Sequence, residues 1–385
     1  MSGWTTKKLG EVCEEIRERI SSAEIPLAAY ITTDNMLKNC AGVCEAENLP
    51  PKICSLVAYQ SGDILLSNIR PYLKKIWLAD RSGGASSDVI VLRPRFENIL
   101  ARYIYRALAR EEFFDFSMLN VTGTKMPRGK RDWIKSFEIP IPPLAEQKRI
   151  VAKIDAAFEK IDRLKTNAEK NLANAKELFQ SALDEAFKTP KGDKVRLRDV
   201  CDVLAGYPFK GNSFSETGIK ICVGLIITPT EIKWSECKHW DSSEGLEDYL
   251  LAVDDIVIAL DRPWIADGFK IGMIEEGDLP CLLIQRTARL RAKKVIPKYL
   301  LYVLRHPAFK EYCTFTGATV PHISHKDIER YMIPCPPLTE QKQIIKHLDF
   351  LLEKIKMLEQ NYERQIADCA EMRQAILREA FEGRL

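Results

Sequence analysis

One segment of the 385-residue chain occurs twice, and this repeat constrains the fold more than any other feature. Residues 139–187 align with residues 333–381 without a gap, at an offset of 194, and 23 of the 49 positions are identical. Self-similarity over a long fixed period indicates that the chain is built from equivalent parts. We therefore expect two quasi-equivalent halves, each with one globular domain and one long helix.

Both copies of the segment predict a long helix. Each opens with two prolines, Pro142-Pro143 or Pro336-Pro337, which suit a first helical turn because its N–H groups lack helical partners. More than 40 residues without glycine or proline follow, up to the stop at residues 189–192 in the first copy and Gly383 in the second. At about 1.5 Å per residue, each helix would be roughly 65 Å long.

Apolar residues follow a 4-3-4-3 spacing in both copies, which is typical of a coiled-coil seam. The expected seam is Ile150, Ile154, Ala157, Ile161, Leu164, Ala168, Asn171, Ala175, Leu178 and Ala182 in the first copy, and Ile344, Leu348, Leu351, Ile355, Leu358, Tyr362, Gln365, Cys369, Met372 and Ile376 in the second. Small residues of one copy would face larger ones of the other. Because a whole domain separates the copies in sequence, we expect the two helices to pair antiparallel.

The two intervening domains also resemble each other, with insertions that belong in loops. Lys8–Cys13 matches Arg196–Cys201, Arg70-Pro71-Tyr72 matches Arg262-Pro263-Trp264, and a Thr-Gly-x3-Pro pattern occurs at 122–127 and again at 316–321. Short β-branched runs predict strands at 63–67, 74–78, 88–92 and 134–139 and, in the second domain, at 255–260, 269–274, 282–290 and 328–333. Helices are expected at 99–109 and 298–305.

The expected fold class is therefore α+β. Two similar mixed α/β domains would be separated by two long antiparallel coiled-coil helices with pseudo-two-fold symmetry. The expected boundaries are 1–143 for the first domain, 144–188 for the first helix, 189–337 for the second domain and 338–385 for the second helix. Such a body suits a duplex target with two half-sites at fixed spacing.

Composition and motifs argue against several functional classes. No run of about 18 apolar residues is present and the N-terminus is charged, so we expect a cytoplasmic protein without a membrane span or secretory signal. The eleven cysteines form no C-x-x-C pair, so no metal site is expected. Walker-type, H-E-x-x-H, G-x-S-x-G and G-x-G-x-x-G patterns are absent, so we expect no catalytic residues.

Basic and aromatic residues gather in the loops that the two domains share, and they are the candidate DNA contacts. Lysine and arginine suit phosphates, and arginine also suits base edges in the major groove. The candidates are Arg70, Tyr72, Lys74, Lys75, Thr124, Lys125, Arg128, Lys130 and Arg131 in the first domain, and Arg262, Trp264, Arg286, Arg289, His322, His325 and Lys326 in the second.

Apolar residues outside the expected seam are candidates for docking partner subunits. They are Phe158, Leu172 and Phe179 on the first helix and Leu352 and Ile366 on the second. Wider packing between the two helices, or packing onto the domains, would use the same residues. Two other functional classes also stay open: an enzyme fused to two reading domains, and a coiled-coil adaptor without DNA function.

The doubled run Pro-x-Pro-Pro-Leu-x-Glu-Gln-x-x-Ile followed by a heptad helix resembles the specificity subunits of type I restriction–modification enzymes. The resemblance covers nearly the whole chain and includes the Lys-Leu-Gly-Glu-Val-Cys-type opening of each domain. It implies two target-recognition domains that read a bipartite, asymmetric double-stranded DNA site, with the helical pair setting the spacer length.

The resemblance also implies partners. Two modification (methyltransferase) subunits would dock on the helices and methylate adenines, and two ATP-dependent restriction subunits would join them. S-adenosylmethionine, ATP and Mg²⁺ are then expected on the partners and no cofactor in this chain. A methylation-only system, or a system of another restriction type, would use the same chain.

Overall fold

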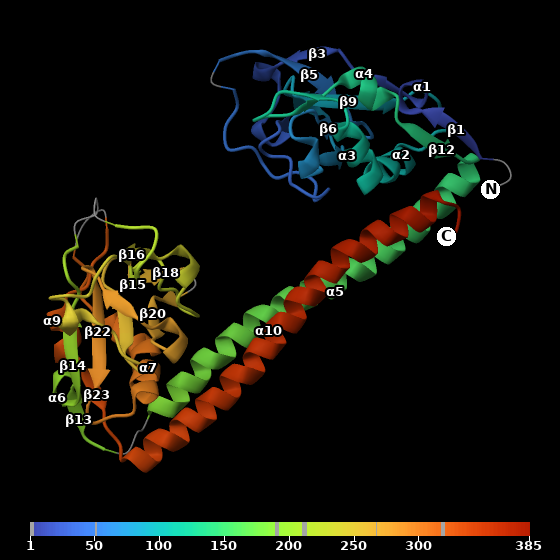
Figure 1. Ribbon diagram of the computed structural model, residues 1–385. Helices are drawn as coiled ribbons and strands as arrows, with labels where there is room; N and C mark the ends of the chain where they lie inside the picture. Colours follow the sequence, from blue (N-terminus) through green and yellow to red (C-terminus); the bar gives the residue numbers. More distant parts are fainter. Residues whose placement is uncertain (1–3, 51, 189–191, 210–213, 267, 317–319) are drawn as a thin grey trace. The chain divides into compact units, whose positions relative to one another are not determined.

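The computed structural model describes residues 4–50, 52–188, 192–209, 214–266, 268–316 and 320–385. It divides into two compact units, the first with residues 1–170 and 363–385 and the second with residues 171–362. Two long helices, α5 (Leu144–Lys188) and α10 (Leu338–Phe381), contribute residues to both units. We call the globular part before α5 domain 1 and the part between α5 and α10 domain 2 (Figure 1).

Domain 1 is built around an antiparallel sheet with the strand order β2-β9-β6-β7 (Cys13–Glu15, Val89–Pro94, Ile64–Ser67, Ile76–Leu78). A second sheet has the order β3-β5-β8-β4 (Arg19–Ser21, Ser55–Tyr59, Gly83–Ala85, Tyr30–Ile31), and β1 (Thr5–Lys8) pairs with β12 (Glu138–Ile141). The other elements are α1 (Leu9–Val12), α2 (Ala101–Leu108), α3 (Glu111–Met118), α4 (Arg131–Lys135), β10 (Val121–Thr122), β11 (Arg128–Gly129) and the 3-10 turns Ser22–Glu24, Leu27–Ala29 and Pro71–Leu73.

Domain 2 repeats this plan. Its antiparallel sheet has the order β14-β22-β17-β20 (Cys201–Ala205, Thr287–Ala292, Ile256–Ala259, Ile271–Met273), and a smaller sheet has the order β16-β15-β21 (Lys238–Trp240, Ile219–Cys222, Cys281–Leu283). Two further pairs are β13–β23 (Lys194–Arg196, Met332–Pro334) and β18–β19 (Trp264–Ile265, Gly268–Phe269). The helices are α6 (Leu197–Val200), α7 (Pro297–Arg305), α8 (Pro307–Tyr312) and α9 (His325–Arg330), with 3-10 turns at Trp234–Glu236, Glu247–Tyr249 and Glu276–Asp278.

The central strand of each main sheet is buried on both faces. Ile64 and Leu66 of β6 join the core beneath α2 and α3, whereas Leu65 joins a second core on the other side of the sheet. In domain 2, Ile256 and Val257 of β17 divide in the same way. Successive strand residues point to opposite faces, so a continuous apolar run marks a sheet covered on both sides.

The fold class expected from the sequence is confirmed, with local corrections. The expected strand at 134–139 is wrong in its first half, because residues 131–135 form α4 and the strand begins at Glu138. The same error occurs in domain 2, where α9 precedes β23. The expected strand at 282–290 is two strands, β21 and β22, separated by a turn at Gln285 and Arg286.

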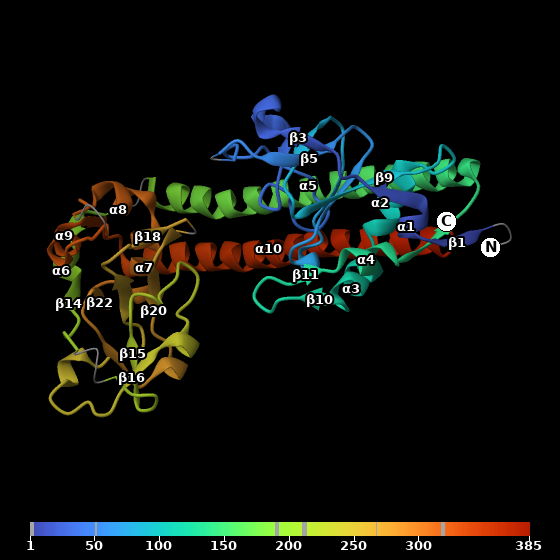
Figure 2. The ribbon, with the colours of Figure 1, turned by 90° about the horizontal axis from the view of Figure 1, so that it is seen from above.

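The ends of α5 and α10 pair antiparallel within each unit (Figure 1, Figure 2). In the first unit, Ile150, Ile154 and Ile161 of α5 share one core with Cys369 and Leu377 of α10. In the second unit, Leu183 of α5 and Leu348 of α10 share a core with Tyr302. The predicted stop of α5 at residues 189–191 and residues 317–319 of the second Thr-Gly-x3-Pro pattern lie outside the described residues.

The expected seam is half right. Ile150, Ile154 and Ile161 are buried as expected, but four apolar residues of the expected seam are exposed: Leu164 at 56%, Leu178 at 49%, Leu358 at 39% and Met372 at 48%. Phe158, expected outside the seam, is buried. The seam is therefore broader and rotated, because each helix also packs against its own domain.

Candidate nucleic-acid interface

Two loops that the sequence marks as DNA-facing meet in domain 1. The backbone N–H of Arg70 donates a 2.7 Å hydrogen bond to the carbonyl of Pro127, and Ile69 forms a β-bridge with Arg128. The Arg-Pro-Tyr run and the Thr-Gly-x3-Pro loop, more than 50 residues apart in sequence, thus form one surface.

The equivalent loops meet in domain 2 by the same bonds. Arg262 N–H donates to the carbonyl of Pro321 at 2.8 Å, and Asp261 forms a β-bridge with His322. The two domains therefore hold their candidate loops on a common backbone frame.

Several candidate DNA contacts are non-glycine residues with a positive φ. Seven such residues occur in the described part of the chain, and four of them are candidate DNA contacts: Arg70 (φ 51°), Lys74 (φ 52°), Arg262 (φ 43°) and Arg286 (φ 67°). A side chain in this region costs of order 1–3 kcal/mol, and such strain clusters at functional sites. The surrounding hydrogen bonds fix where each basic side chain leaves the backbone.

The other domain 1 candidates differ in their exposure and in whether their side chains are bonded to other residues. Tyr72 is 49% exposed, and Thr124, Lys125 and Lys130 are exposed without a side-chain bond to a described residue. Lys74 is bonded to Glu111 at 2.5 Å. Lys75 donates to the carbonyl of Thr33, and partial burial lowers the pKa of its ammonium.

Two arginines of the domain 1 loop are braced by carboxylates. Arg128 forms an ion pair with Asp88 at 3.1 Å. Arg131 is bonded to Glu15 and donates to the carbonyl of Ser87 at 2.7 Å. These acidic partners cannot be found from sequence spacing alone, because Asp88 lies in the turn before β9 and Glu15 lies in β2, far from the loop in sequence.

In domain 2, one carboxylate connects two candidates. Asp261 Oδ1 lies 2.7 Å from His322 Nδ1, and its Oδ2 lies 3.1 Å from Arg286 Nη1. His325 is half-buried and Lys326 is exposed, both in the first turn of α9. Trp264 is half-buried and stacks on Phe269 with ring centroids 4.4 Å apart.

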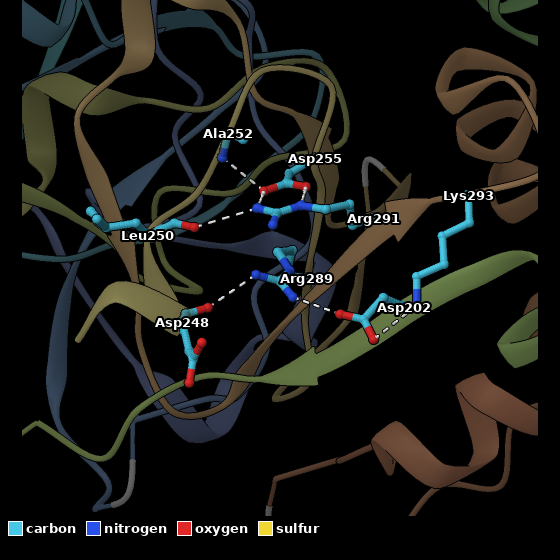
Figure 3. Close-up of polar contacts among 8 residues, drawn as sticks. All are labelled: Asp202, Asp248, Leu250, Ala252, Asp255, Arg289, Arg291 and Lys293. Atoms are coloured by element: carbon cyan, nitrogen blue, oxygen red, sulfur yellow. Dashed lines mark hydrogen bonds and ion pairs between the residues drawn. The ribbon is translucent and has the colours of Figure 1, made fainter. Parts of the chain in front are cut away.

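Arg289 does not belong to this surface. Arg289 is only 5% exposed, and its guanidinium donates to Asp202 Oδ2 at 2.7 Å and to the carbonyl of Asp248 at 3.0 Å (Figure 3). Arg291, on the same strand, forms a two-point ion pair with buried Asp255. Both arginines connect parts of domain 2, so we exclude Arg289 from the candidate DNA contacts.

The repeated Pro-Pro-Leu-x-Glu-Gln run fixes each helix to its domain. Gln147 Oε1 accepts from Leu100 N–H at 2.9 Å, and its Nε2 donates to the carbonyls of Pro142 and Asn98. Gln341 makes the equivalent bonds to Ile296 N–H and to the carbonyl of Pro336. Both glutamines are 1% exposed, so the motif is a structural clamp between domain and helix.

A second repeated contact uses an aspartate eight residues, or about two turns, further along each helix. Asp155 pairs with Arg102 at 2.7 Å and with Arg106 at 2.6 Å. In the second unit, Asp349 pairs with Lys298 at 2.8 Å and accepts a bond from the Tyr302 hydroxyl. Burial and this bond raise the pKa of Tyr302.

The five docking candidates expected from the sequence differ in how far they are exposed. Phe158 is 6% exposed and lies between the guanidinium groups of Arg106 and Arg373, each 4.6 Å from its ring centroid. Phe179 packs edge-on against Tyr302, and Leu172, Leu352 and Ile366 are half-buried. Phe158 therefore supports the fold and is unavailable to a partner.

Four exposed apolar residues form a better docking candidate, which we call the outer set: Leu164, Leu178, Leu358 and Met372. Each lies nine residues from a residue that contacts its domain: Asp155, Phe187, Asp349 and Phe381 respectively. Nine residues are 2.5 helical turns, so each outer-set residue points away from its domain.

Two absences hold for the described residues only. No group of three or more His, Cys, Asp or Glu side chains there could hold a metal ion. None of the described helices has both the length and the apolar character that a membrane crossing needs.

Comparison with known proteins identifies a family and several relatives that resemble this chain. The family model "Type I restriction modification DNA specificity domain" matches residues 1–174 and 191–366. The MjaVIII specificity subunit of Methanocaldococcus jannaschii is 29% identical over 302 residues, which are 71% of this chain and 69% of that protein. The EcoAI specificity subunit of Escherichia coli is 34% identical over 181 residues, 46% of this chain, and this match spans only 31% of that protein.

Solved structures share the fold. A chain from work on complex assembly and conformational transition of the type I R-M system matches with a TM-score of 0.80 at 23% identity, over 100% of this chain and 99% of that one. The HsdS subunit of Thermoanaerobacter tengcongensis matches with a TM-score of 0.60 at 23% identity, over 100% and 98%. With two specificity domains that together cover most of its length, the chain belongs to the type I restriction–modification DNA specificity subunit family.

Proposed function

We propose that each domain reads one half of a bipartite double-stranded DNA site. The main observation behind this proposal is the common frame of the candidate loops. Arg70 bonds Pro127 in domain 1, and Arg262 bonds Pro321 in the same way in domain 2. Exposed basic residues surround each frame, and these suit phosphate contact and base reading. Because the side chains on the two frames differ, the two half-sites differ and the whole site is asymmetric.

The long helices set the spacing of the two half-sites. The Gln147 and Gln341 clamps, together with the Asp155 and Asp349 contacts, join each domain firmly to its helix. A change in helix length would therefore be transmitted to the domain instead of being absorbed at the joint.

The outer set receives the modification subunits. Its four side chains are apolar, 39–56% exposed and turned away from the domains. Because the set contains two residues in each unit, it offers two equivalent docking places, one for each of two modification subunits. Restriction subunits would join the complex through these partners.

The chain itself is non-catalytic in this proposal. S-adenosylmethionine, ATP and Mg²⁺ act on the partner subunits, and this chain supplies DNA specificity and a scaffold for adenine methylation. A fused enzyme would have to act alone, so the pure chain with S-adenosylmethionine and DNA discriminates the two readings.

The test is reconstitution with the modification subunit of the same restriction–modification system. The purified complex should methylate plasmid DNA at a split motif, and neither component should do so alone. Binding of duplex DNA by the complex should weaken steeply as salt rises, because phosphate contacts release counterions. A complex that forms but binds DNA without sequence preference would overturn the proposal.

A further inference from the structure

We propose that Arg128 of domain 1 and Arg286 of domain 2 read guanine, each braced by a carboxylate. This inference rests on the proposed DNA-reading function and names the side chains that make the two half-sites different. It starts from a comparison of equivalent backbone positions in the two domains.

The hydrogen bonds of the frame define which positions are equivalent. Asn68 N–H donates to the carbonyl of Asp88 at 2.8 Å, and Leu260 N–H donates to the carbonyl of Arg286 at 2.9 Å. Asp88 and Arg286 each precede the strand that pairs with the central one, β9 or β22. The two residues therefore occupy one place in the two frames.

The partner position is also shared. Ile69 bridges Arg128, and Asp261 bridges His322, so Arg128 and His322 correspond. At the first position, domain 1 has a carboxylate (Asp88) and domain 2 a guanidinium (Arg286). At the second position, domain 1 has the guanidinium (Arg128) and domain 2 an imidazole (His322). The same frame thus presents its arginine from opposite loops in the two domains.

Each arginine is held by an acidic neighbour but not buried by it. Arg128 pairs with Asp88 at 3.1 Å and its side chain is 49% exposed. Arg286 pairs with Asp261 at 3.1 Å and its side chain is 75% exposed. Asp261 also bonds His322, which fixes the carboxylate itself.

This arrangement suits base reading better than phosphate contact. A guanidinium has five N–H donors, so a bond to one carboxylate leaves a free edge. That edge matches the O6 and N7 acceptors of guanine in the major groove. A braced side chain loses less conformational entropy on binding than a free one. By contrast, Lys125 and Lys130, exposed and unbraced by described residues, suit phosphates.

The test uses the full chain in complex with its modification subunits and a DNA library with one randomised base pair at a time. Arg286→Lys and Arg128→Lys keep the charge but lose the two-point contact with guanine. Each variant should lose about 5- to 150-fold of the preference for one G·C pair. The affected pair should lie in a different half-site for each variant, and the rest of the motif should stay unchanged.

Arg81→Lys and Arg198→Lys are the matched controls, since both arginines lie outside the two loop frames and are partly exposed. They should leave the motif unchanged. A uniform loss over all sequences in Arg286→Lys and Arg128→Lys, or no loss, would overturn the inference while the proposed function stands. If the wild-type complex selects no split motif, the proposed function itself fails.

Asp261→Asn tests the brace. As a positioning residue, Asp261 should affect the same base pair as Arg286 and no other, and the double variant Asp261→Asn/Arg286→Lys should lose little more than Arg286→Lys alone. An additional loss at a second base pair would show that Asp261 also acts through His322 or on DNA directly, and would contradict a role confined to bracing Arg286.

Discussion

Gln147 Oε1 accepts a 2.9 Å hydrogen bond from the backbone N–H of Leu100, 47 residues earlier in the chain. Gln341 makes the same 2.9 Å bond to Ile296 in the second unit. The most conspicuous motif of the sequence therefore anchors the start of each long helix to the helix that covers its domain's core.

Replacing Gln147 should destabilise the first unit. Gln147→Ala removes the buried amide that bonds the Leu100 N–H and the carbonyls of Asn98 and Pro142, which should cost about 2 kcal/mol or more. The measurement is the free energy of unfolding in urea. Lys148→Ala, one residue on and exposed, is the control and should change this energy by less than about 0.5 kcal/mol. Equal stability of the two variants would contradict the clamp.

The ion pair of Arg106 with Asp155 should be replaceable by a tyrosine–aspartate hydrogen bond, which the second unit has at the same place. Tyr302 stands at the place of Arg106 and donates to Asp349 through its hydroxyl. Arg106→Leu should lower the free energy of unfolding by about 1–3 kcal/mol, and Arg106→Tyr should recover much of the loss. Arg102→Leu removes a side chain that is 51% exposed, so it should cost less than about 1 kcal/mol. If tyrosine is no better than leucine, the two contacts are not equivalent.

Charge on the outer set should weaken partner binding without unfolding the chain. Leu358→Asp and Leu164→Asp place a carboxylate at exposed apolar positions, so an interface buried there would lose affinity at least about tenfold, or 1.4 kcal/mol. Co-purification and titration of the modification subunit measure this loss. Gln360→Asp adds the same charge two residues on and is the control.

Phe158→Asp separates docking from folding. Since Phe158 is buried between two guanidinium groups, this variant should lower the melting temperature, which the outer-set variants leave unchanged. Full partner binding by Leu164→Asp and Leu358→Asp would reject the outer set as the docking place.

Helix length should control the spacer of the DNA site. One heptad inserted at matched places in α5 and α10 adds roughly 10 Å, close to three base pairs. The methylated motif should keep both half-sites and gain about three spacer base pairs. A two-residue insertion, which rotates the helix by about 200° and adds no full turn, should abolish activity. An unchanged spacer after the heptad insertion would contradict the ruler.

The sequence predicted what repetition and periodicity control. The two halves, the long helices and the central strands follow from the doubled segment and from β-branched runs such as Ile64–Ser67. The seam was half wrong because a periodic pattern shows which residues avoid water but not what covers them. Phe158 and Leu164 are both apolar, yet only the first meets its domain.

From the sequence, the candidate site could be predicted only as two separate loops in each domain. Their meeting depends on bonds such as that from Arg70 to Pro127, which join residues far apart in the chain. The carboxylates Asp88 and Asp261 could not be selected, because nothing in their local sequence distinguishes them from other surface aspartates. Arg289 shows the converse: the sequence placed it among the candidate DNA contacts, whereas Asp202 of β14 and Asp248 of a 3-10 turn bind its guanidinium inside domain 2.

The most direct test of the account is a map of methylated adenines in genomic DNA, by long-read sequencing, from cells with and without this gene. The account predicts a split, asymmetric motif that is methylated in the first cells and disappears in the second. Where the modification subunit is expressed in both, an unchanged methylation pattern would contradict the claim that this chain gives a methyltransferase its DNA specificity.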